Sequence, residues 1–219
     1  MFTGLVQAIG RVERVEAVPE GVRLVIDPCG WDPGAGRGGS VAVNGCCLTL
    51  TEEPRDQSGR LGFVAIPETL EKTTLGGLQA DSRVNLETAV SASTLMGGHF
   101  VQGHVDGVGH VVRVPEGPEG DADGSWRVRL EPPAGLMRYM TPKGSICLDG
   151  VSLTIAGLDP AQGWIEVALI PETLEQTTLR GWRAGDGVNF EADVLAKTVV
   201  HQIEHFLDRA ALDAIGKQR

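Results

Sequence analysis

The sequence predicts an all-β protein made of two tandem copies of a small domain, followed by one C-terminal helix. Three observations lead to this prediction: a long internal repeat, short strand-like runs separated by turns, and an amphipathic pattern confined to the end of the chain. The repeat is the clearest of the three. Residues 66–75 read IPETLEKTTL and residues 170–179 read IPETLEQTTL, so nine of ten positions are identical.

The repeat extends well beyond these ten residues, in the same order. The segment NGCCLTL at 44–50 aligns with DGVSLTI at 149–155, and VNLE at 84–87 aligns with VNFE at 188–191. A period of about 100 residues is too long for a solenoid unit and matches a small domain with its own core.

These alignments divide the chain into three parts. We expect an N-terminal domain at residues 1–97, a second domain at 98–194 and a terminal segment at 195–219. A duplicated domain suggests duplicated binding sites, which could hold two molecules of one ligand face to face.

Within each domain, short runs rich in Val, Leu and Ile are separated by turns, in a chain with 30 Gly and 12 Pro. Such frequent turns indicate a small closed barrel or sandwich. The Pro-Glu-Thr-Leu-Glu block places Pro at a first helical position with acids in the first turn, so a short helix is expected in each repeat. The strands expected in the first repeat are 22–26, 40–43, 47–51, 63–66 and 84–87, with a turn at Asn44-Gly45.

The terminal segment has the apolar period of an amphipathic helix. Such a helix docks either on its own domain or on a partner subunit, and periodicity does not distinguish the two. The apolar positions, spaced by threes and fours, are Val199, Ile203, Phe206, Leu207, Ala210 and Ala214.

Composition limits the class of partner. No apolar run reaches the ~20 residues of a membrane helix, and the N-terminus has no signal-peptide pattern. The four cysteines lack zinc-type spacing, which favours free thiols in a reducing cytoplasm. A net charge of −10 without a basic stretch argues against nucleic acid and anionic membranes. A small molecule is the expected partner.

Three motifs carry no chemistry in their context. The glycines of residues 34–39 lack the preceding strand and following helix that a dinucleotide-binding loop needs. His201 and His205 flank a glutamate in an inverted zincin pattern, but nothing else resembles a zinc protease, so a solvated helix face is expected. Cys46 and Cys47 lack the two-residue spacer of a redox motif.

Small polar residues recur at equivalent positions of the two repeats. Cys47 and Thr49 lie two apart on a strand and face the same side, as do Ser152 and Thr154. Hydroxyl and thiol groups beside backbone amides suit a planar, polar heterocycle, although a barrel exterior also carries such groups. The full sets are Gly4, Ser40, Asn44, Cys47, Thr49, Glu68 and Thr69 in the first repeat, and Gly103, His104, Asp149, Ser152, Thr154, Glu172 and Thr173 in the second.

One histidine differs between the repeats. His104 aligns with Leu5, and a histidine can transfer protons near neutral pH. Two similar sites with one asymmetric histidine suit a reaction in which two copies of a ligand do different jobs. His99 lies five residues earlier, which on a strand would place it on the opposite face.

Several motifs together resemble the riboflavin synthase family of the alpha-chain type. They are MFTGLV at the start, NGCCLT, GGHFVQGHVD, and DGVSLT with IPETL, and the resemblance covers essentially the whole chain. It implies two six-stranded antiparallel Greek-key barrels and a terminal helix that assembles a homotrimer. It also implies dismutation of two molecules of 6,7-dimethyl-8-ribityllumazine, with no cofactor and no metal, and it leaves an association with lumazine synthase open.

In this family the active site forms between the N-terminal barrel of one subunit and the C-terminal barrel of its neighbour. Many members carry a polar residue where Pro67 stands here, a change that backbone contacts tolerate. The resemblance assigns Gly4, Leu5, Val6, Ser40, Cys47, Leu48, Thr49, Val64, Ala65, Ile66, Pro67, Glu68 and Thr69 to the N-terminal barrel site. It assigns Gly103, His104, Val105, Lys143, Asp149, Ser152, Leu153, Thr154, Ala168, Leu169, Ile170, Pro171, Glu172 and Thr173 to the C-terminal barrel site.

The catalytic hypothesis is that His104 moves a proton while Ser152, Thr154 and Asp149 position the ring, with Cys47 lining the other site. The sequence does not say which barrel holds the donor. One alternative is a lumazine or flavin carrier, an optical antenna without catalysis; another is a barrel protein with no ligand. The hydroxyl pairs kept in both repeats favour the enzyme.

Overall fold

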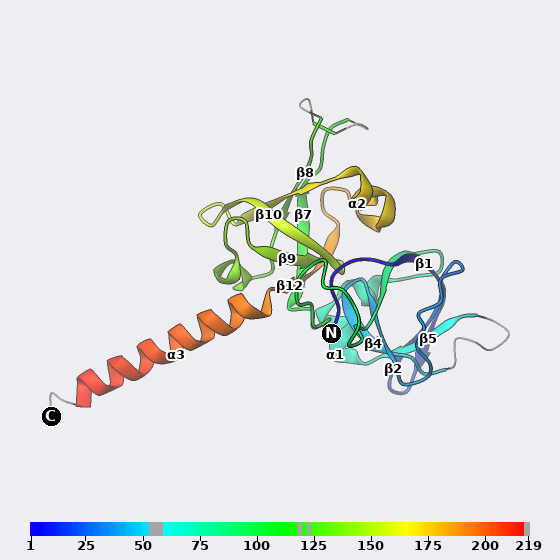
Figure 1. The fold of residues 1–219 in the computed structure, drawn as a ribbon, viewed down its shortest axis with the longest axis horizontal. Coiled ribbons are helices and arrows are strands. Elements are labelled where there is room, and N and C mark those ends of the chain that lie inside the picture. The colour runs from blue at the N-terminus through cyan, green and yellow to red at the C-terminus, as the bar shows by residue number, and fades with distance from the viewer. Residues whose placement is uncertain (53–58, 118–119, 122–123, 217–219) are drawn as a thin grey trace.

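The computed structural model describes residues 1–52, 59–117, 120–121 and 124–216, and of residues 207–216 only the backbone. Two β domains lie side by side and a long helix extends away from them (Figure 1). The all-β class with a C-terminal helix is confirmed. The described part of the chain has no helix long and apolar enough to cross a membrane.

The first repeat forms a six-stranded antiparallel sheet in the order β4-β3-β6-β1-β2-β5. The neighbours β3 with β6 and β2 with β5 are not consecutive in the chain, which is the Greek-key pattern. Its elements are β1 (Ala8–Val18), β2 (Gly21–Asp27), β3 (Ser40–Val43), β4 (Cys46–Thr49), β5 (Leu61–Ala65), the helix α1 (Pro67–Lys72), the 3₁₀ helix η1 (Thr74–Gly77) and β6 (Arg83–Thr88).

The second repeat has the equivalent strand order and is a closed barrel, β10-β11-β8-β7-β12-β9. Its elements are β7 (Gly107–Arg113), β8 (Trp126–Glu131), η2 (Leu136–Tyr139), β9 (Ser145–Leu148), β10 (Val151–Asp159), β11 (Trp164–Leu169), the helix α2 (Pro171–Gln176), η3 (Thr178–Gly181) and β12 (Gly187–Ala192).

The two repeats differ in how their sheets close. In the second, β10 runs to Asp159 and pairs with β11 over several residues. In the first, β4 ends at Thr49. Among the described residues after it, Leu50 forms an isolated bridge with Phe63 of β5, and the Thr51 N–H donates to the Gly62 carbonyl at 2.9 Å. In its described residues the first repeat is therefore a six-stranded sheet and the second a closed barrel, where two similar six-stranded barrels were expected.

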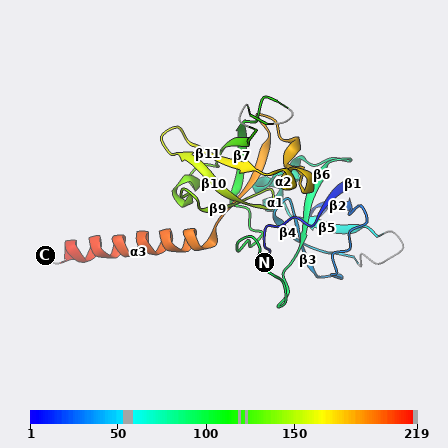
Figure 2. The same ribbon diagram turned by 45° about the horizontal axis from the view of Figure 1, so that its top comes forward.

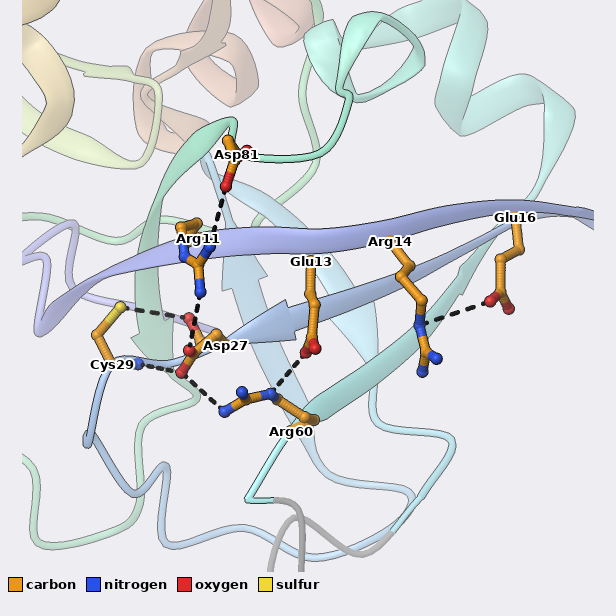
Figure 3. Close-up of polar contacts among 8 residues, drawn as sticks. All are labelled: Arg11, Glu13, Arg14, Glu16, Asp27, Cys29, Arg60 and Asp81. Atoms are coloured by element: carbon orange, nitrogen blue, oxygen red, sulfur yellow. Dashed lines mark hydrogen bonds and ion pairs between the residues drawn. The ribbon is translucent and has the colours of Figure 1, made fainter.

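Each sheet surrounds an apolar core built from alternate strand residues. Leu24, Ile26 and Phe63 are fully buried in the first core, and Val128 and Leu130 in the second. The outer face of the first sheet is charged instead (Figure 3). Arg60, just before β5, pairs with Glu13 on β1 at 2.6 Å and with Asp27 at the end of β2 at 3.1 Å. Arg11 on β1 pairs with Asp81 at 2.9 Å. The Arg11–Asp81 pair is exposed and contributes little to stability, and the Arg60 pairs are half-buried.

The expected local structures are present. The turn between β3 and β4 has Asn44 and Gly45 both at positive φ, 45° and 76°, and the turn between β9 and β10 has Asp149 and Gly150 at 44° and 82°. These are the angles of a two-residue hairpin turn that favours Asn-Gly. The Pro-Glu-Thr-Leu blocks are the short helices α1 and α2, each with proline in its first turn.

The C-terminal helix α3 (Val194–Gly216) begins where Asp193 caps it, its carboxylate accepting the Leu195 N–H at 2.8 Å. It projects away from both barrels (Figure 2). The apolar side chains Leu195, Val199, Ile203 and Phe206 are 54–72% exposed. The helix still contacts its own domain through Lys197 with Asp106 at 2.5 Å and Glu204 with Arg138 at 3.2 Å. Whether the exposed apolar stripe docks on its own domain or on a partner subunit stays a prediction. The side chains of Leu207, Ala210 and Ala214, and residues 217–219, lie outside what the structure describes.

Candidate functional site

The two strand pairs singled out in the sequence face outward from their barrels. Cys46 and Leu48 point into the first core, so Cys47 and Thr49 point away from it, and the burial pattern of β10 gives Ser152 and Thr154 the same orientation. The predicted same-face geometry is confirmed. Burial in the core raises the pKa of the Cys46 thiol to about 12, whereas the half-buried Cys47 lies on the outer side of β4.

A cavity of about 250 Å³ lies over the Cys47 face, between β4, the helix α1 and the segment that enters the second repeat. The thiol of Cys47, the hydroxyl of Thr69 and the imidazole of His104 are the polar groups of its wall that suit a heterocycle. The residues that line it are Cys46, Cys47, Glu68, Thr69, Lys72, Thr73, Gly103, His104 and Val105.

This cavity corrects the grouping of residues inferred from the repeat. Residues 103–105, expected at the second-repeat site, lie on the first repeat: the Gly103 carbonyl accepts the Cys47 N–H at 2.8 Å, and Val105 packs against the first core. Conversely, the Gly4 carbonyl accepts the Ser152 N–H at 2.7 Å, and Val6 packs against the second core. The segments at the start of each repeat are therefore exchanged between the barrels.

Both exchanged segments pack closely against the strands that they contact, β10 for Gly4 and β4 for Gly103. Gly4 has φ of +75° and Gly103 has φ of +80°, a conformation that favours glycine. A Cβ at Gly4 would lie 2.6 Å from Cβ of Ser152, and a Cβ at Gly103 would lie 2.6 Å from Cβ of Cys47. Glycine at these two positions is what allows the segment to lie against the site.

The second-repeat site contains a histidine that the sequence argument dismissed. Nδ1 of His99 lies 2.7 Å from Oγ of Ser152, and the His99 N–H donates to the Thr3 carbonyl at 3.1 Å. Residues 98–100 are not a strand, so alternation of faces does not apply to His99. Burial lowers the pKa of His99, which favours the neutral imidazole beside the serine hydroxyl. Among the described residues, Nε2 of His99 is buried and has no hydrogen-bond partner.

Each site therefore pairs a small polar strand residue with a histidine. Cys47 and His104 line the first, and Ser152 and His99 are bonded in the second. His104 and Ser152, which the sequence argument grouped together, belong to different sites of the same chain.

The other predicted residues fall into three groups. Ile66, Pro67, Glu68, Ile170, Pro171 and Glu172 are exposed where the short helices begin, beside the half-buried Thr69 and Thr173. Leu48, Ala65, Leu153 and Leu169 point into the barrels, and Val64 and Ala168 point out of them. Ser40 pairs with Thr49, Leu5 is exposed beside Gly4, and Lys143 lies exposed in the turn before β9.

Asp149 has a different environment from the ring-positioning one expected. It is 6% exposed, its Oδ1 accepts the Asn189 N–H at 2.9 Å, and its Oδ2 accepts the Trp182 indole N–H at 3.1 Å. Burial raises its pKa to about 7, against the effect of these two bonds. The carboxyl group thus fixes the β9–β10 turn, and its contact with a ligand stays a prediction.

Asp149 also borders a larger cavity of about 730 Å³ between the repeats. Its walls come from η1, η3 and the ends of both second hairpins, not from the Cys47 and Ser152 faces. The lining residues are Asn44, Thr74, Leu78, Ser82, Arg83, Asp149, Leu174, Glu175, Thr177, Thr178, Arg180, Gly181, Trp182, Asp186 and Gly187.

Comparison with known proteins gives the same twofold division. The family model described as "Lumazine binding domain" matches residues 3–89 and again residues 102–193. The chain is 45% identical over 202 residues to a riboflavin synthase of Mycobacterium tuberculosis, covering 91% of this chain and 96% of that one. The chain belongs to the riboflavin synthase family. A riboflavin synthase of Bacillus subtilis is 36% identical over 197 residues, covering 90% and 87%.

Solved structures of a protein named LumP share the fold of this chain. A crystal structure of LumP with riboflavin has a TM-score of 0.75 and 25% identity, and one of LumP with 6,7-dimethyl-8-(1'-D-ribityl) lumazine has 0.73 and 24%. Each covers 88% of this chain and 99% of LumP. The architecture is thus common to this family and to a protein crystallised with a lumazine and with a flavin.

Proposed function

We propose that this chain is a riboflavin synthase. Two molecules of 6,7-dimethyl-8-ribityllumazine react by transfer of a four-carbon unit from one to the other, giving riboflavin and 5-amino-6-(D-ribitylamino)uracil. One observation carries the proposal: both repeats keep an outward-facing polar strand pair, crossed by a glycine segment, with a histidine beside it. The names of the relatives in the family support the same activity.

The chemistry needs a base and close alignment of two rings. The C7 methyl group of a lumazine is a carbon acid, and its loss of a proton gives a carbanion equivalent that attacks the second lumazine. An imidazole at His104 or His99 suits this proton transfer near neutral pH. Holding both rings in register supplies a proximity effect of up to ~7–11 kcal/mol. The polar groups of Cys47, Ser152 and Thr154 would orient the rings.

The two rings meet between subunits in this proposal. A cavity of about 250 Å³ is small for a complete ligand site, which commonly has about 300–1,000 Å³, so a second wall from a neighbouring subunit would complete it. Exposed apolar residues next to the Ser152 site fit such a contact: Leu5, Leu95, Met96 and Phe100. The exposed apolar stripe of α3 would hold the subunits together as a homotrimer.

Three finer expectations accompany this function. The division into barrels at 1–97 and 98–194 with an oligomerisation helix at 195–219, the cytoplasmic location and an association with lumazine synthase stay predictions. The reaction requires neither a metal nor a redox cofactor in this proposal.

The test is to mix the purified protein with 6,7-dimethyl-8-ribityllumazine and follow absorbance as riboflavin forms. Conversion with two lumazines consumed for each riboflavin is the expected result. Tight binding without conversion would contradict the proposal and would indicate a carrier or antenna protein instead.

A further inference from the structure

The exchanged segments are held by two buried glutamates that no part of the reaction uses. Glu87 on β6 accepts the Thr3 N–H at 2.6 Å, the Thr3 hydroxyl at 2.7 Å and the Gly4 N–H at 3.0 Å. Glu191 on β12 accepts the Gln102 N–H at 2.6 Å and the Gly103 N–H at 2.9 Å. Each glutamate is 3% exposed. A buried carboxylate is costly unless it is hydrogen-bonded, so these bonds fix the segments firmly.

The direction of each contact is the informative feature. Glu87 belongs to the first repeat, but the segment it holds continues directly to Ser152 of the second, through the Gly4 carbonyl. Glu191 belongs to the second repeat, and the segment it holds continues to Cys47 of the first, through the Gly103 carbonyl. The two segments also pair with each other, because the Phe2 N–H donates to the Val101 carbonyl at 2.7 Å.

We infer that Glu87 and Glu191 are positioning residues that act crosswise, each setting the wall of the ligand site on the opposite repeat. Glu191 places Gly103 and His104 against Cys47, and Glu87 places Gly4 against Ser152. The inference rests on the proposed function for the identity of the ligand and on the contacts alone for the crossed positioning.

Because Gly4 and Gly103 lie in close contact with the strands, the loss of one hydrogen bond at the glutamate changes the position of the segment at the ligand site. The carbonyl of Gly4 or Gly103 accepts a hydrogen bond from the strand, and the space between segment and strand is too small for a Cβ atom. When the glutamate no longer accepts two N–H groups, the segment is tied on one side only and opens away from the strand residue. The strand residue then becomes more accessible.

Thiol reactivity measures this opening without any ligand. Cys47 is half-buried under the segment, Cys46 and Cys147 are buried, and Cys29 is exposed on the outer face of the first repeat, where Asp27 accepts its N–H (Figure 3). A Cys29→Ser background therefore leaves Cys47 as the thiol nearest to solvent. Labelling with 5,5′-dithiobis(2-nitrobenzoate), mapped by mass spectrometry, reports the first site.

The second site can carry the same reporter. Ser152 occupies the position equivalent to Cys47, so Ser152→Cys with Cys29→Ser and Cys47→Ser moves the thiol from one site to the other. Glu87→Gln and Glu191→Gln are then introduced separately into both backgrounds. Glutamine keeps the shape of glutamate but presents an NH₂ group to one of the two N–H donors, so one bond is lost and a donor is left unpaired.

The expected pattern is crossed. Glu191→Gln should speed labelling of Cys47 by about tenfold, the effect of one lost buried charge-assisted bond, and change the Ser152→Cys reporter by less than about twofold. Glu87→Gln should do the reverse. In a titration with 6,7-dimethyl-8-ribityllumazine, each variant should weaken the binding step of the crossed site and leave the other step unchanged.

Two results would overturn the inference. One is acceleration on the same repeat as the substituted glutamate; the other is equal acceleration of both reporters, which means general loosening. Far-ultraviolet circular dichroism and urea unfolding establish that each variant is folded. If a glutamine variant does not fold, Glu191→Asp and Glu87→Asp replace it, because they retain the charge and are too short to reach both N–H groups. Since labelling needs no lumazine, failure of the crossed pattern is distinct from failure of the proposed activity.

Discussion

Asn44 and Asp149 occupy equivalent hairpin turns of the two repeats and differ in one side-chain atom, the amide nitrogen of Asn44 and the second carboxylate oxygen of Asp149. Asn44 accepts the Asn85 N–H at 2.8 Å, and Asp149 accepts the Asn189 N–H at 2.9 Å in the equivalent way. The second carboxylate oxygen of Asp149 binds the indole of Trp182, where the first repeat has Leu78. An asparagine is thus compatible with the backbone of this turn, and the aspartate at position 149 makes the turn titratable.

Asp149→Asn should change how stability depends on pH. The folded-state pKa of about 7 is above the usual value of 3.8, so the folded protein binds this proton more tightly than the unfolded chain. The stability that this provides is present below pH 4 and is lost as pH rises to about 7. Relative to Asp149→Asn, the wild-type free energy of unfolding should fall by about 2–4 kcal/mol between pH 4 and 8 in urea titrations.

The reciprocal substitution is the control for this prediction. Asn44→Asp buries a carboxyl group at the equivalent turn and should add a pH dependence of the same sign. A difference between wild type and Asp149→Asn that stays constant across this pH range would contradict the assignment of the raised pKa.

His104→Ala tests the proton-transfer hypothesis. Loss of a general base should lower turnover by about 10²–10⁴-fold, with a smaller effect on lumazine binding, because the thiol and hydroxyl groups of the site remain. His110 is exposed on β7 and outside the cavity around Cys47, so His110→Ala is the matched control. Unchanged turnover in His104→Ala would remove its catalytic role.

At the scale of elements, periodicity and turn chemistry predicted most of what the structure contains. The hairpin turn at Asn44-Gly45, the short helices α1 and α2 and the start of α3 lie where local signals indicated them. These features depend on neighbours in sequence, which a single chain displays directly. The shared face of Cys47 and Thr49, and that of Ser152 and Thr154, followed from strand alternation for the same reason.

The exchange of segments could not be predicted in this way. An internal alignment shows which residues are equivalent, and it is the same whether Gly103 contacts its own repeat or the other one. His99 was misjudged because strand alternation was applied to residues that form no strand. Both errors concern where an irregular segment crosses, and long-range contacts decide that.

α3 should determine the oligomeric state without being needed for the barrels. Val199→Glu with Ile203→Glu places two carboxylates on the exposed apolar stripe, where subunit contact would desolvate them. Sedimentation equilibrium should show monomers for this variant and trimers for the wild type, with unchanged thermal unfolding of the β domains. His201→Glu with His205→Glu has the same spacing on another face of α3 and should stay trimeric. An unchanged trimer in the Val199 and Ile203 variant would place the contact elsewhere.

At the scale of the whole molecule, two buried asparagines join the repeats about an approximate twofold axis. The Asn85 side chain donates to the Asp149 carbonyl at 2.8 Å and accepts the Thr178 N–H at 2.8 Å. The Asn189 side chain donates to the Asn44 carbonyl at 2.8 Å and accepts the Thr74 N–H at 2.7 Å. Each amide satisfies backbone groups of the opposite repeat, so the two barrels are held in one orientation.

Asn85→Ala and Asn189→Ala should therefore destabilise the protein by similar amounts. Each leaves a buried carbonyl and an amide N–H without its partner, which costs about 1–3 kcal/mol for each group. Urea unfolding monitored by tryptophan fluorescence measures both variants. A large loss for one asparagine beside no loss for the other would mean that the contact between the repeats is not equivalent on its two sides.

The crossing of residues 1–6 and 99–105 makes the two repeats of one chain resemble the two subunits of a symmetric dimer. The bonds of Gly4 and Gly103 to the opposite strands, and those of Asn85 and Asn189, are mirrored about the approximate axis, as in an isologous pair in which residue i meets j and j meets i. Two separate copies of one repeat could make the same bonds, but only by finding each other in solution. In one chain that encounter is intramolecular and independent of concentration. Each half also has its own sequence, so one site can carry cysteine while the other carries serine.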